Sequence, residues 1–447
     1  MLASAVLLAA GPVLPAQADP QEGGLVQLDL GFDGAQPDNW SQARGISSDG
    51  RYGLFTSLAS NLVPGDTNRL YDIFVRDLHE GRTERVSVAD DGSQLEGSTS
   101  QAAISADGRY VAFSSDAPGV VPGQPSDGGT KIFVRDRRTG HTELLPAAWN
   151  AGSPAISADG RYVAYASDRR DIYVTDRRQG TTRLVTTAPD GSRADKASAD
   201  PVISADGATI GFRSLATNLL PHGQAPAVRP HEARKADQAH AVPSPETGAA
   251  PASLVSATPA PASPALPGPR PPVRHTFPFF TYDAHTGRIQ GASVDQAGVL
   301  RDAHPFATLS PDGRYALFRV FETNAPATDG SHAELYVRDL QEKTTTKAGS
   351  PLPGTQTVHD SHRGTVTADG RHLFFGSGAD NLVPGDTNQA VDIFRRDLRT
   401  GQIERISMTG GDTEVSWTPN SLSVDGLGSL ALFDAFGKVY ARPLPAT

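Results

Sequence analysis

The chain has 447 residues, including 45 glycines, 35 prolines and no cysteine, and its formal net charge is -10. This charge argues against a nucleic-acid-binding protein, because neutralising phosphates needs a basic surface. The absence of cysteine excludes disulfides and thiolate metal sites. The glycine and proline content indicates a turn-rich protein without long helices.

The first segment has the pattern of an export signal. Its apolar run, Leu2 to Ala10, is too short to span a bilayer, and Ala16-Gln17-Ala18 has the small-x-small form of a signal-peptidase site. We predict that residues 1–18 are a secretory signal peptide, and that the mature protein is secreted or periplasmic, without stable membrane insertion. The alternative is an ordinary chain terminus.

A short pattern then recurs seven times along the chain. Its copies include GISSDGRYGLFTS from Gly45, AISADGRYVAFSS from Ala103 and GTVTADGRHLFFGS from Gly364. Asp-Gly between apolar segments is a strong hairpin signal, because glycine adopts a positive φ without steric cost. The apolar residues that open the copies are Ile46, Ile104, Ile156, Ile203, Leu309, Val366 and Leu422. The recurrence predicts seven similar structural units.

Each unit continues with further strand-like segments, such as DIFVRD and then TERVSV in the first copy. Four antiparallel strands per unit are typical of a β-propeller blade, and in sequence order we name these strands A to D. The last unit stops after its third strand, and residues 25–30 resemble the fourth-strand segments. We therefore predict an all-β, seven-bladed propeller over residues 23–445, whose last blade is closed by residues 25–30, which removes open sheet edges.

One segment interrupts the repeats. Residues 224–272 hold 12 of the 35 prolines and no aromatic residue. Such a composition cannot build a packed core, so we predict a disordered insertion between the second and third strands of blade 4.

The combination of ISADGRYVAFSS with IFVRDRRTG resembles the repeat of the TolB-like, PD40 or WD40-like bacterial propellers. The resemblance covers nearly all of the chain outside the first segment and the insertion. It implies the propeller architecture, and it leaves function open, because the family includes partner-binding periplasmic proteins and the propeller parts of peptidases.

Two almost identical stretches suggest a metal site. NLVPGDTNRLYDIFVRDL from Asn61 and NLVPGDTNQAVDIFRRDL from Asn381 share 14 of 18 residues and lie in the connection between the second and third strands. Their oxygen-bearing side chains are of the kind that Ca²⁺ prefers. The candidate ligands are Asp66, Asn68 and Asp72 in blade 1 and Asp386, Asn388 and Asp392 in blade 6. The alternative is a Pro-Gly turn followed by an Asx-turn that starts the third strand.

Repeated aspartates are interpreted as turn-formers, because a residue that recurs in most blades belongs to the scaffold. One set closes the third strands: Asp77, Asp136, Asp176, Asp283, Asp339 and Asp397. The other set lies in the Asp-Gly turns: Asp49, Asp107, Asp159, Asp206, Asp312, Asp369 and Asp425. Functional residues should therefore be sought among those that the repeats do not share.

Tryptophans and histidines meet that criterion. Trp40, Trp149 and Trp417 all fall in connections between the fourth strand of one blade and the first strand of the next. They are candidates for a stacking platform, or for plugs between neighbouring blades. His359 and His362, in the HDSH stretch before blade 6, are candidates for ligand binding, or solvated loop residues.

No motif in the sequence completes a catalytic set, since G-x-S-x-G and H-E-x-x-H are both absent. The sequence therefore favours a monomeric binding module for an envelope or extracellular protein or peptide, with no required cofactor. It would bind through the face formed by the B–C and D–A connections. The competing hypothesis is a lyase or hydrolase that acts on cell-envelope glycans at the mouth of the channel.

Overall fold

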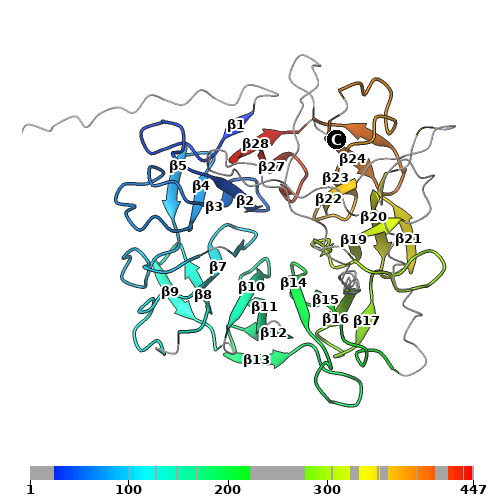
Figure 1. Cartoon of the computed structure of the whole chain (residues 1–447), viewed down its shortest axis with the longest axis horizontal. Helices are drawn as coiled ribbons and strands as arrows, with labels where there is room; N and C mark the ends of the chain where they lie inside the picture. Colours follow the sequence, from blue (N-terminus) through cyan, green and yellow to red (C-terminus); the bar gives the residue numbers. More distant parts are fainter. Residues whose placement is uncertain are drawn as a thin grey trace, which may run out of the picture.

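A computed structural model describes residues 25–99, 101–125, 128–146, 150–167, 170–221, 277–303, 306–322, 332–349, 352, 361–388, 390–407, 421–435 and 437–444. Within these residues, 28 strands form seven four-stranded antiparallel sheets arranged in a ring (Figure 1). The all-β, seven-bladed propeller is therefore confirmed. None of the described residues belongs to a helix long and apolar enough to cross a membrane.

Blades 1 to 3 follow one another directly along the chain. Blade 1 holds β2 (Ser41–Ile46), β3 (Tyr52–Ser57), β4 (Asp72–Asp77) and β5 (Arg82–Arg85). Blade 2 holds β6 (Ala102–Ile104), β7 (Tyr110–Ser115), β8 (Lys131–Asp136) and β9 (His141–Leu144). Blade 3 holds β10 (Ala151–Ile156), β11 (Tyr162–Ser167), β12 (Asp171–Asp176) and β13 (Thr181–Leu184).

Blades 4 to 6 repeat the same strand order. Blade 4 holds β14 (Ser198–Ile203), β15 (Thr209–Ser214), β16 (Phe279–Asp283) and β17 (Ile289–Gly291). Blade 5 holds β18 (Thr308–Leu309), β19 (Tyr315–Glu322), β20 (His332–Asp339) and β21 (Thr344–Lys347). Blade 6 holds β22 (Ser361–Val366), β23 (His372–Ser377), β24 (Asp392–Asp397) and β25 (Ile403–Arg405).

Blade 7 joins the two ends of the described chain. Its strands β26 (Ser421–Val424), β27 (Leu430–Ala435) and β28 (Lys438–Pro443) are completed by β1 (Val26–Gln27), and β1 lies beside β28 in Figure 1. The N–H of Leu28 also donates to the Val439 carbonyl at 2.8 Å. The predicted closure is thus confirmed, although the strand is shorter than residues 25–30, because the chain turns where the Gly31 N–H bonds the Ala35 carbonyl.

Two of the predicted segments lie outside the described residues. The predicted signal peptide, residues 1–18, falls in the first 24 positions, which are not described. The insertion of residues 224–272 also lies outside them. The described strands on either side of it are β15, which ends at Ser214, and β16, which begins at Phe279.

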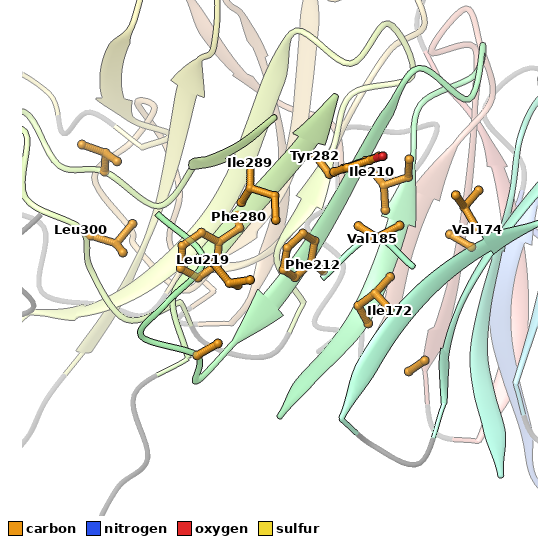
Figure 2. Close-up of a cluster of buried hydrophobic side chains, with 14 residues drawn as sticks. Ile172, Val174, Val185, Ile210, Phe212, Leu219, Phe280, Tyr282, Ile289 and Leu300 are labelled. Carbon is orange, nitrogen blue, oxygen red and sulfur yellow. The ribbon is translucent and has the colours of Figure 1, made fainter. Parts of the chain in front are cut away.

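The core is built from one aromatic pair per blade and from apolar clusters between blades. In each blade an aromatic residue of strand B stacks or tilts against one of strand C, with ring centroids 5.5 to 6.1 Å apart, as for Phe113 and Phe133 in blade 2. Figure 2 shows the cluster between blades 3 and 4, where Phe212 and Phe280 pack with Ile172 and Val185. Burying such side chains contributes about 1.5–3 kcal/mol each.

On one face of the ring, the A–B turns of neighbouring blades are joined by backbone hydrogen bonds. The donor and acceptor pairs are Ser48 to Ala106, Ala106 to Ala158, Ala158 to Ala205, Ala205 to Pro311, Ala368 to Gly426 and Gly426 to Ser48, at 2.7 to 3.1 Å. The step from blade 5 to blade 6 lacks the equivalent donor, because the turn residue there is Pro311, which has no N–H. Around the rest of the ring, these bonds hold the blades close together at this end of the axis.

The repeated aspartates form turns and pair with repeated arginines. Asp136 accepts the Arg138 N–H, and its carboxylate receives two hydrogen bonds from Arg109, at 3.0 and 2.7 Å. Asp49 accepts hydrogen bonds from the Ser47 hydroxyl and the Arg51 N–H in the A–B turn. Equivalent Arg–Asp pairs occur in blades 1, 3, 5 and 6. The interpretation of these aspartates as scaffold is confirmed by these contacts.

Candidate functional site

Four of the innermost strands contain a register shift near their start. The shifts follow Ala43 in β2, Gly152 in β10, Ala199 in β14 and Ser361 in β22. A β-bulge inserts an extra residue, re-aims a side chain, and is common beside functional sites. The residues carried in these shifts include Arg44, Ser153, Asp200 and Arg363. Each strand A begins at a D–A connection and ends at an A–B turn. The bulges therefore lie at the end of the axis that is opposite the hydrogen-bonded A–B turns. We call this end of the propeller, which carries the bulges, the mouth face.

Backbone strain accompanies the bulges. Ser153 and Asp200 have φ angles of 52° each, and Phe306, which precedes β18 by two residues, has a φ of 91°. A positive φ is unusual outside glycine and is an outlier for a bulky residue. Such strain persists where surrounding structure holds it, and it concentrates at functional sites. Asp200 is held by its neighbour Arg213, whose Nε donates to Asp200 Oδ2 at 2.9 Å.

A second set of residues that differ between blades lies in the strands next to the innermost ones. Each follows the paired aromatic residue of strand B, so it occupies the same place in every blade. The set comprises Thr56, Ser114, Ala166, Arg213, Arg319, Gly376 and Asp434. Because strand B ends at the mouth face, these residues lie toward the same end as the bulges.

Five of these non-repeated residues form what we call the axial cluster: Arg44, Phe306, Arg319, Arg363 and Asp434. The Arg363 guanidinium carbon lies 3.3 Å from the centroid of the Phe306 ring. Arg363 is also close enough to Asp434, Arg44 and Arg319 for their charges to act on it. The cluster spans blades 5, 6, 7 and 1, which are consecutive around the ring.

The electrostatics of the cluster are those of crowded cations. Burial is the main cause that lowers the pKa of Arg363 to about 10; Asp434 acts against it, and the weaker repulsion by Arg44 and Arg319 adds to it. Burial likewise lowers the pKa of Arg44, against the effect of Asp434 and Tyr71. Both guanidiniums remain charged at neutral pH. Among the described residues, the one carboxylate that acts on both Arg44 and Arg363 is Asp434, in a chain whose net charge is -10.

Hydrogen bonds fix several of the surrounding side chains. Arg44 Nε donates to Thr56 Oγ1 at 3.2 Å, which ties the bulge of β2 to β3. The Ser421 hydroxyl donates to the Asp434 carboxylate, which is buried. An anion that entered the cluster would therefore meet the guanidiniums of Arg44 and Arg363, which both lie on strands.

Of the three tryptophans, the described residues include only Trp40. Its side chain is 67% exposed, and its ring lies against Gly437 of blade 7. A Cβ on Gly437 would come within 2.8 Å of Trp40 Cε3, and the φ of Gly437 is 74°. Trp40 thus contacts blade 7 from the connection that leads into blade 1, while much of its surface stays open to solvent, and both of its proposed roles stay predictions.

The remaining predicted face residues are not brought together by described contacts. Trp149, Trp417 and His359 lie outside the described residues. His362 lies in β22 at the bulge, next to Arg363 in sequence, and its side chain is outside the described part. The proposed roles of these four residues stay predictions.

The blade 1 loop contains an arginine where the metal was expected. Arg85 Nη1 lies 3.5 Å from Asp66 Oδ1 and 3.6 Å from Asp72 Oδ2. Asn68 Nδ2 donates to Asp72 Oδ2 at 3.0 Å, and Asn68 Oδ1 accepts the Leu70 N–H at 2.9 Å. The second bond is the Asx-turn considered as the alternative.

Blade 6 repeats this arrangement. Arg405 Nη1 lies 3.0 Å from Asp386 Oδ1 and 3.7 Å from Asp392 Oδ2, and Asn388 accepts the Ala390 N–H. Within the described residues, no group of three or more histidine, cysteine, aspartate or glutamate side chains could hold a metal ion. A guanidinium thus already lies beside both carboxylates in each loop, and calcium binding there stays a prediction.

The sequence contained a signal for the axial cluster that residue type alone did not reveal. Six residues before the Asp of each Asp-Gly turn, the first six repeats carry Ala43, Gln101, Ser153, Asp200, Phe306 and Arg363. This position varies completely while its surroundings repeat. Aligning the repeats and reading the variable columns would have identified Phe306 and Arg363, whereas a search for tryptophan and histidine did not.

Comparison with known proteins supports the fold alone. No family model and no curated relative matches the sequence. Among solved structures, an oligogalacturonate lyase in complex with manganese has a TM-score of 0.51 and 11% identity, and the match covers 97% of each chain. An oligogalacturonate lyase from Vibrio parahaemolyticus also has a TM-score of 0.51, with 9% identity, over 95% of this chain and 99% of the other.

Weaker likenesses extend to two further propellers. The β-propeller domain of the trilobed protease from Pyrococcus furiosus gives a TM-score of 0.47 with 12% identity, over 91% and 94% of the two chains. TolB from Acinetobacter baumannii gives 0.34 with 13% identity, over 84% and 76%. These two scores are too low to support an inference about this chain. The likeness to the two lyases, at 9–11% identity, supports the fold and no particular activity.

Proposed function

We propose that this propeller is a binding module that grips a protein or peptide through its mouth face. The observation that supports it most directly is the placement of non-repeated residues. Five of them gather in the axial cluster, whereas the residues at the opposite end repeat from blade to blade. Interaction surfaces are commonly built from variable residues on a rigid scaffold.

The predicted signal peptide and the TolB-like repeat pattern support an exported protein, so we propose that the partner is an envelope or extracellular protein or peptide. We further propose that the propeller acts as a monomer, since blade 7 closes the ring within one chain. No nucleic acid is expected as a partner, because the chain as a whole is acidic.

Site-specific photo-crosslinking tests this proposal. Tyr71 is partly exposed near Arg44, and Arg82 is exposed at a C–D hairpin on the opposite face. A photoreactive residue is placed at position 71 or at position 82, and the protein is irradiated with the envelope fraction of its host. We expect discrete adducts from position 71 only. Equal adducts from both positions, or none from position 71, would contradict binding through the mouth face.

A second candidate is a lyase or hydrolase acting on acidic glycans. It is favoured by the arginine-rich axial cluster, which suits uronate carboxylates, together with the architecture shared with two oligogalacturonate lyases. Incubation with polygalacturonate, with and without Mn²⁺, tests it. New ultraviolet absorbance from an unsaturated product would support a lyase, new reducing ends without that absorbance would support a hydrolase, and the absence of both would exclude activity on this polymer.

A further inference from the structure

We infer that the axial cluster is an anion site that binds carboxylate groups of an acidic peptide segment. This inference rests on the proposed binding function and adds the chemistry of the ligand. It is carried by three observations: the placement of Arg44 and Arg363 in β-bulges, the contact of Arg363 with Phe306, and the single described carboxylate, Asp434, that acts on both arginines.

The bulges place the guanidiniums. The register shift in β2 contains Arg44, and the shift in β22 contains Arg363. A regular strand would leave these side chains in the pleat, whereas a bulge redirects them and is retained beside sites that need a particular orientation. Two arginines are therefore brought toward one another by the same local device from blades 1 and 6, which are separated along the chain by some 300 residues but share blade 7 as a neighbour.

The Phe306 ring packs against the guanidinium of Arg363. Its ring centroid lies 3.3 Å from the guanidinium carbon, which is a cation–π contact, and its own backbone is held at a φ of 91°. A guanidinium stacked on an aromatic face keeps its in-plane N–H donors available at its edge. Those donors match the two oxygens of a carboxylate.

The charges of the cluster call for an anion. The charge of Arg44 acts on Arg363, and the described carboxylate that acts on both of these arginines is Asp434. Asp434 is buried and accepts a hydrogen bond from Ser421. Farther around the ring, Asp200 is paired with Arg213, so it offsets that arginine and not the cluster. A bound carboxylate would remove repulsion that the folded protein otherwise sustains.

The observations favour a peptide over a sugar. A pyranose needs an open aromatic face for stacking, and one face of the Phe306 ring is already covered by Arg363. A flexible acidic side chain needs only the edge of the guanidinium. Free phosphate and polyuronate share the anionic chemistry, and the experiment separates them from the peptide.

The test uses fluorescence anisotropy with fluorescein-labelled hexaglutamate and the full chain at low salt. We expect saturable binding that weakens by about tenfold or more in Arg363→Gln and in Arg44→Gln, as the loss of a charged hydrogen bond implies. Arg363→Lys should recover part of the affinity. Arg82→Gln, which removes the same charge from an exposed side chain on the opposite face, should bind like the unchanged protein. The urea midpoint of each variant shows whether it folds. If Arg363→Gln does not fold, the affinity of Arg44→Gln decides the test.

Three results would overturn the inference. The first is that hexaglutamate does not bind. The second is that its affinity falls as much in Arg82→Gln as in Arg363→Gln and Arg44→Gln, which would show a general electrostatic attraction and not a specific site. Competition is the third: if trigalacturonate or inorganic phosphate displaces the label at concentrations where unlabelled hexaglutamate does not, the ligand is a glycan or a free anion. If hexaglutamate does not bind but photo-crosslinked adducts form from position 71, the anion site is wrong and binding through the mouth face still stands. If no adducts form from position 71, binding through the mouth face is itself wrong.

Discussion

Two sets of arginines in this propeller have opposite electrostatic surroundings. Arg51, Arg109, Arg161 and Arg314 follow the Asp-Gly turns, and hydrogen bonds to the aspartates that close strand C raise the pKa of each. In the axial cluster, burial lowers the pKa of Arg44 and takes that of Arg363 to about 10. The repeated arginines therefore have partners within their own blade, whereas Arg363 lies near Arg44 and Arg319 and shares the charge of Asp434 with Arg44.

This difference separates structure from function within one residue type. A paired arginine stabilises the blade that carries it, so its loss should lower stability and leave binding unchanged. An arginine held near like charges costs stability, and a bound anion would offset that cost. Substitutions in the scaffold and in the cluster therefore test this division.

Removing a buried acid from the scaffold should have the largest effect. Asp72 is fully buried, accepts a hydrogen bond from Ser87 and lies 3.6 Å from Arg85 Nη1. Asp72→Ala removes one of the two carboxylates beside Arg85 and the buried acceptor of the Ser87 hydroxyl, which together should cost about 3–5 kcal/mol of unfolding free energy. Urea denaturation measures it. Asp91→Ala, which removes an exposed carboxylate, is the control. Equal urea midpoints for the two variants would show that Asp72 does not stabilise the scaffold.

A smaller loss is expected at the contact between blades 1 and 7. Gly437→Ala places a Cβ at a φ of 74° and within 2.8 Å of Trp40 Cε3, which should cost at least the ~1–2 kcal/mol of a left-handed residue. Gly65→Ala, with a φ of 77° and no heavy atom within 4 Å of the added Cβ, isolates the backbone cost. Urea midpoints should fall further for Gly437→Ala. Equal losses would show that Trp40 does not plug this gap.

Asp302 should make stability depend on pH. Burial raises the pKa of Asp302 to about 6, above its value of about 3.9 in the unfolded chain. The folded state therefore holds this proton more tightly, and stability falls as the pH rises from about 4 through 6. Asp302→Asn cannot ionise, so its Tm advantage over the unchanged protein should grow from pH 4 to pH 7. A pH-independent difference would contradict the raised pKa.

Calcium should have the smallest effect. Because Arg85 lies between Asp66 and Asp72, the loop already contains a cation, and neither Ca²⁺ nor EDTA should shift the Tm. A ligand that binds only the folded state would raise it. A Tm that rises with Ca²⁺ in the unchanged protein, and not in Asp66→Ala, would instead establish the calcium site.

The sequence predicted what the repeats share. The Asp-Gly turns, four strands per blade and closure by the segment after Leu25 follow from local patterns that each repeat states again. The position of the repeated aspartates in hairpins was also predictable, because a turn depends on neighbouring residues.

The axial cluster depends on features that no single repeat contains. A bulge arises from the register between two strands, and the contact between Arg363 and Phe306 joins residues of different blades. Trp40, in contrast, was identified by residue type, and its described contact is with the neighbouring blade. Pro311 shows a similar limit, since its effect on the ring of hydrogen-bonded turns appears only when the turns are placed side by side.

The most direct test compares one arginine from each set for both stability and binding. Arg109→Gln and Arg363→Gln remove the same charge, and each variant is measured by urea denaturation and by hexaglutamate anisotropy. We predict that Arg109→Gln lowers the urea midpoint and keeps the affinity, whereas Arg363→Gln keeps or raises the midpoint and loses about tenfold or more in affinity. If Arg363→Gln lowers the midpoint and binds hexaglutamate as tightly as the unchanged protein, the axial cluster is scaffold and the central claim is wrong.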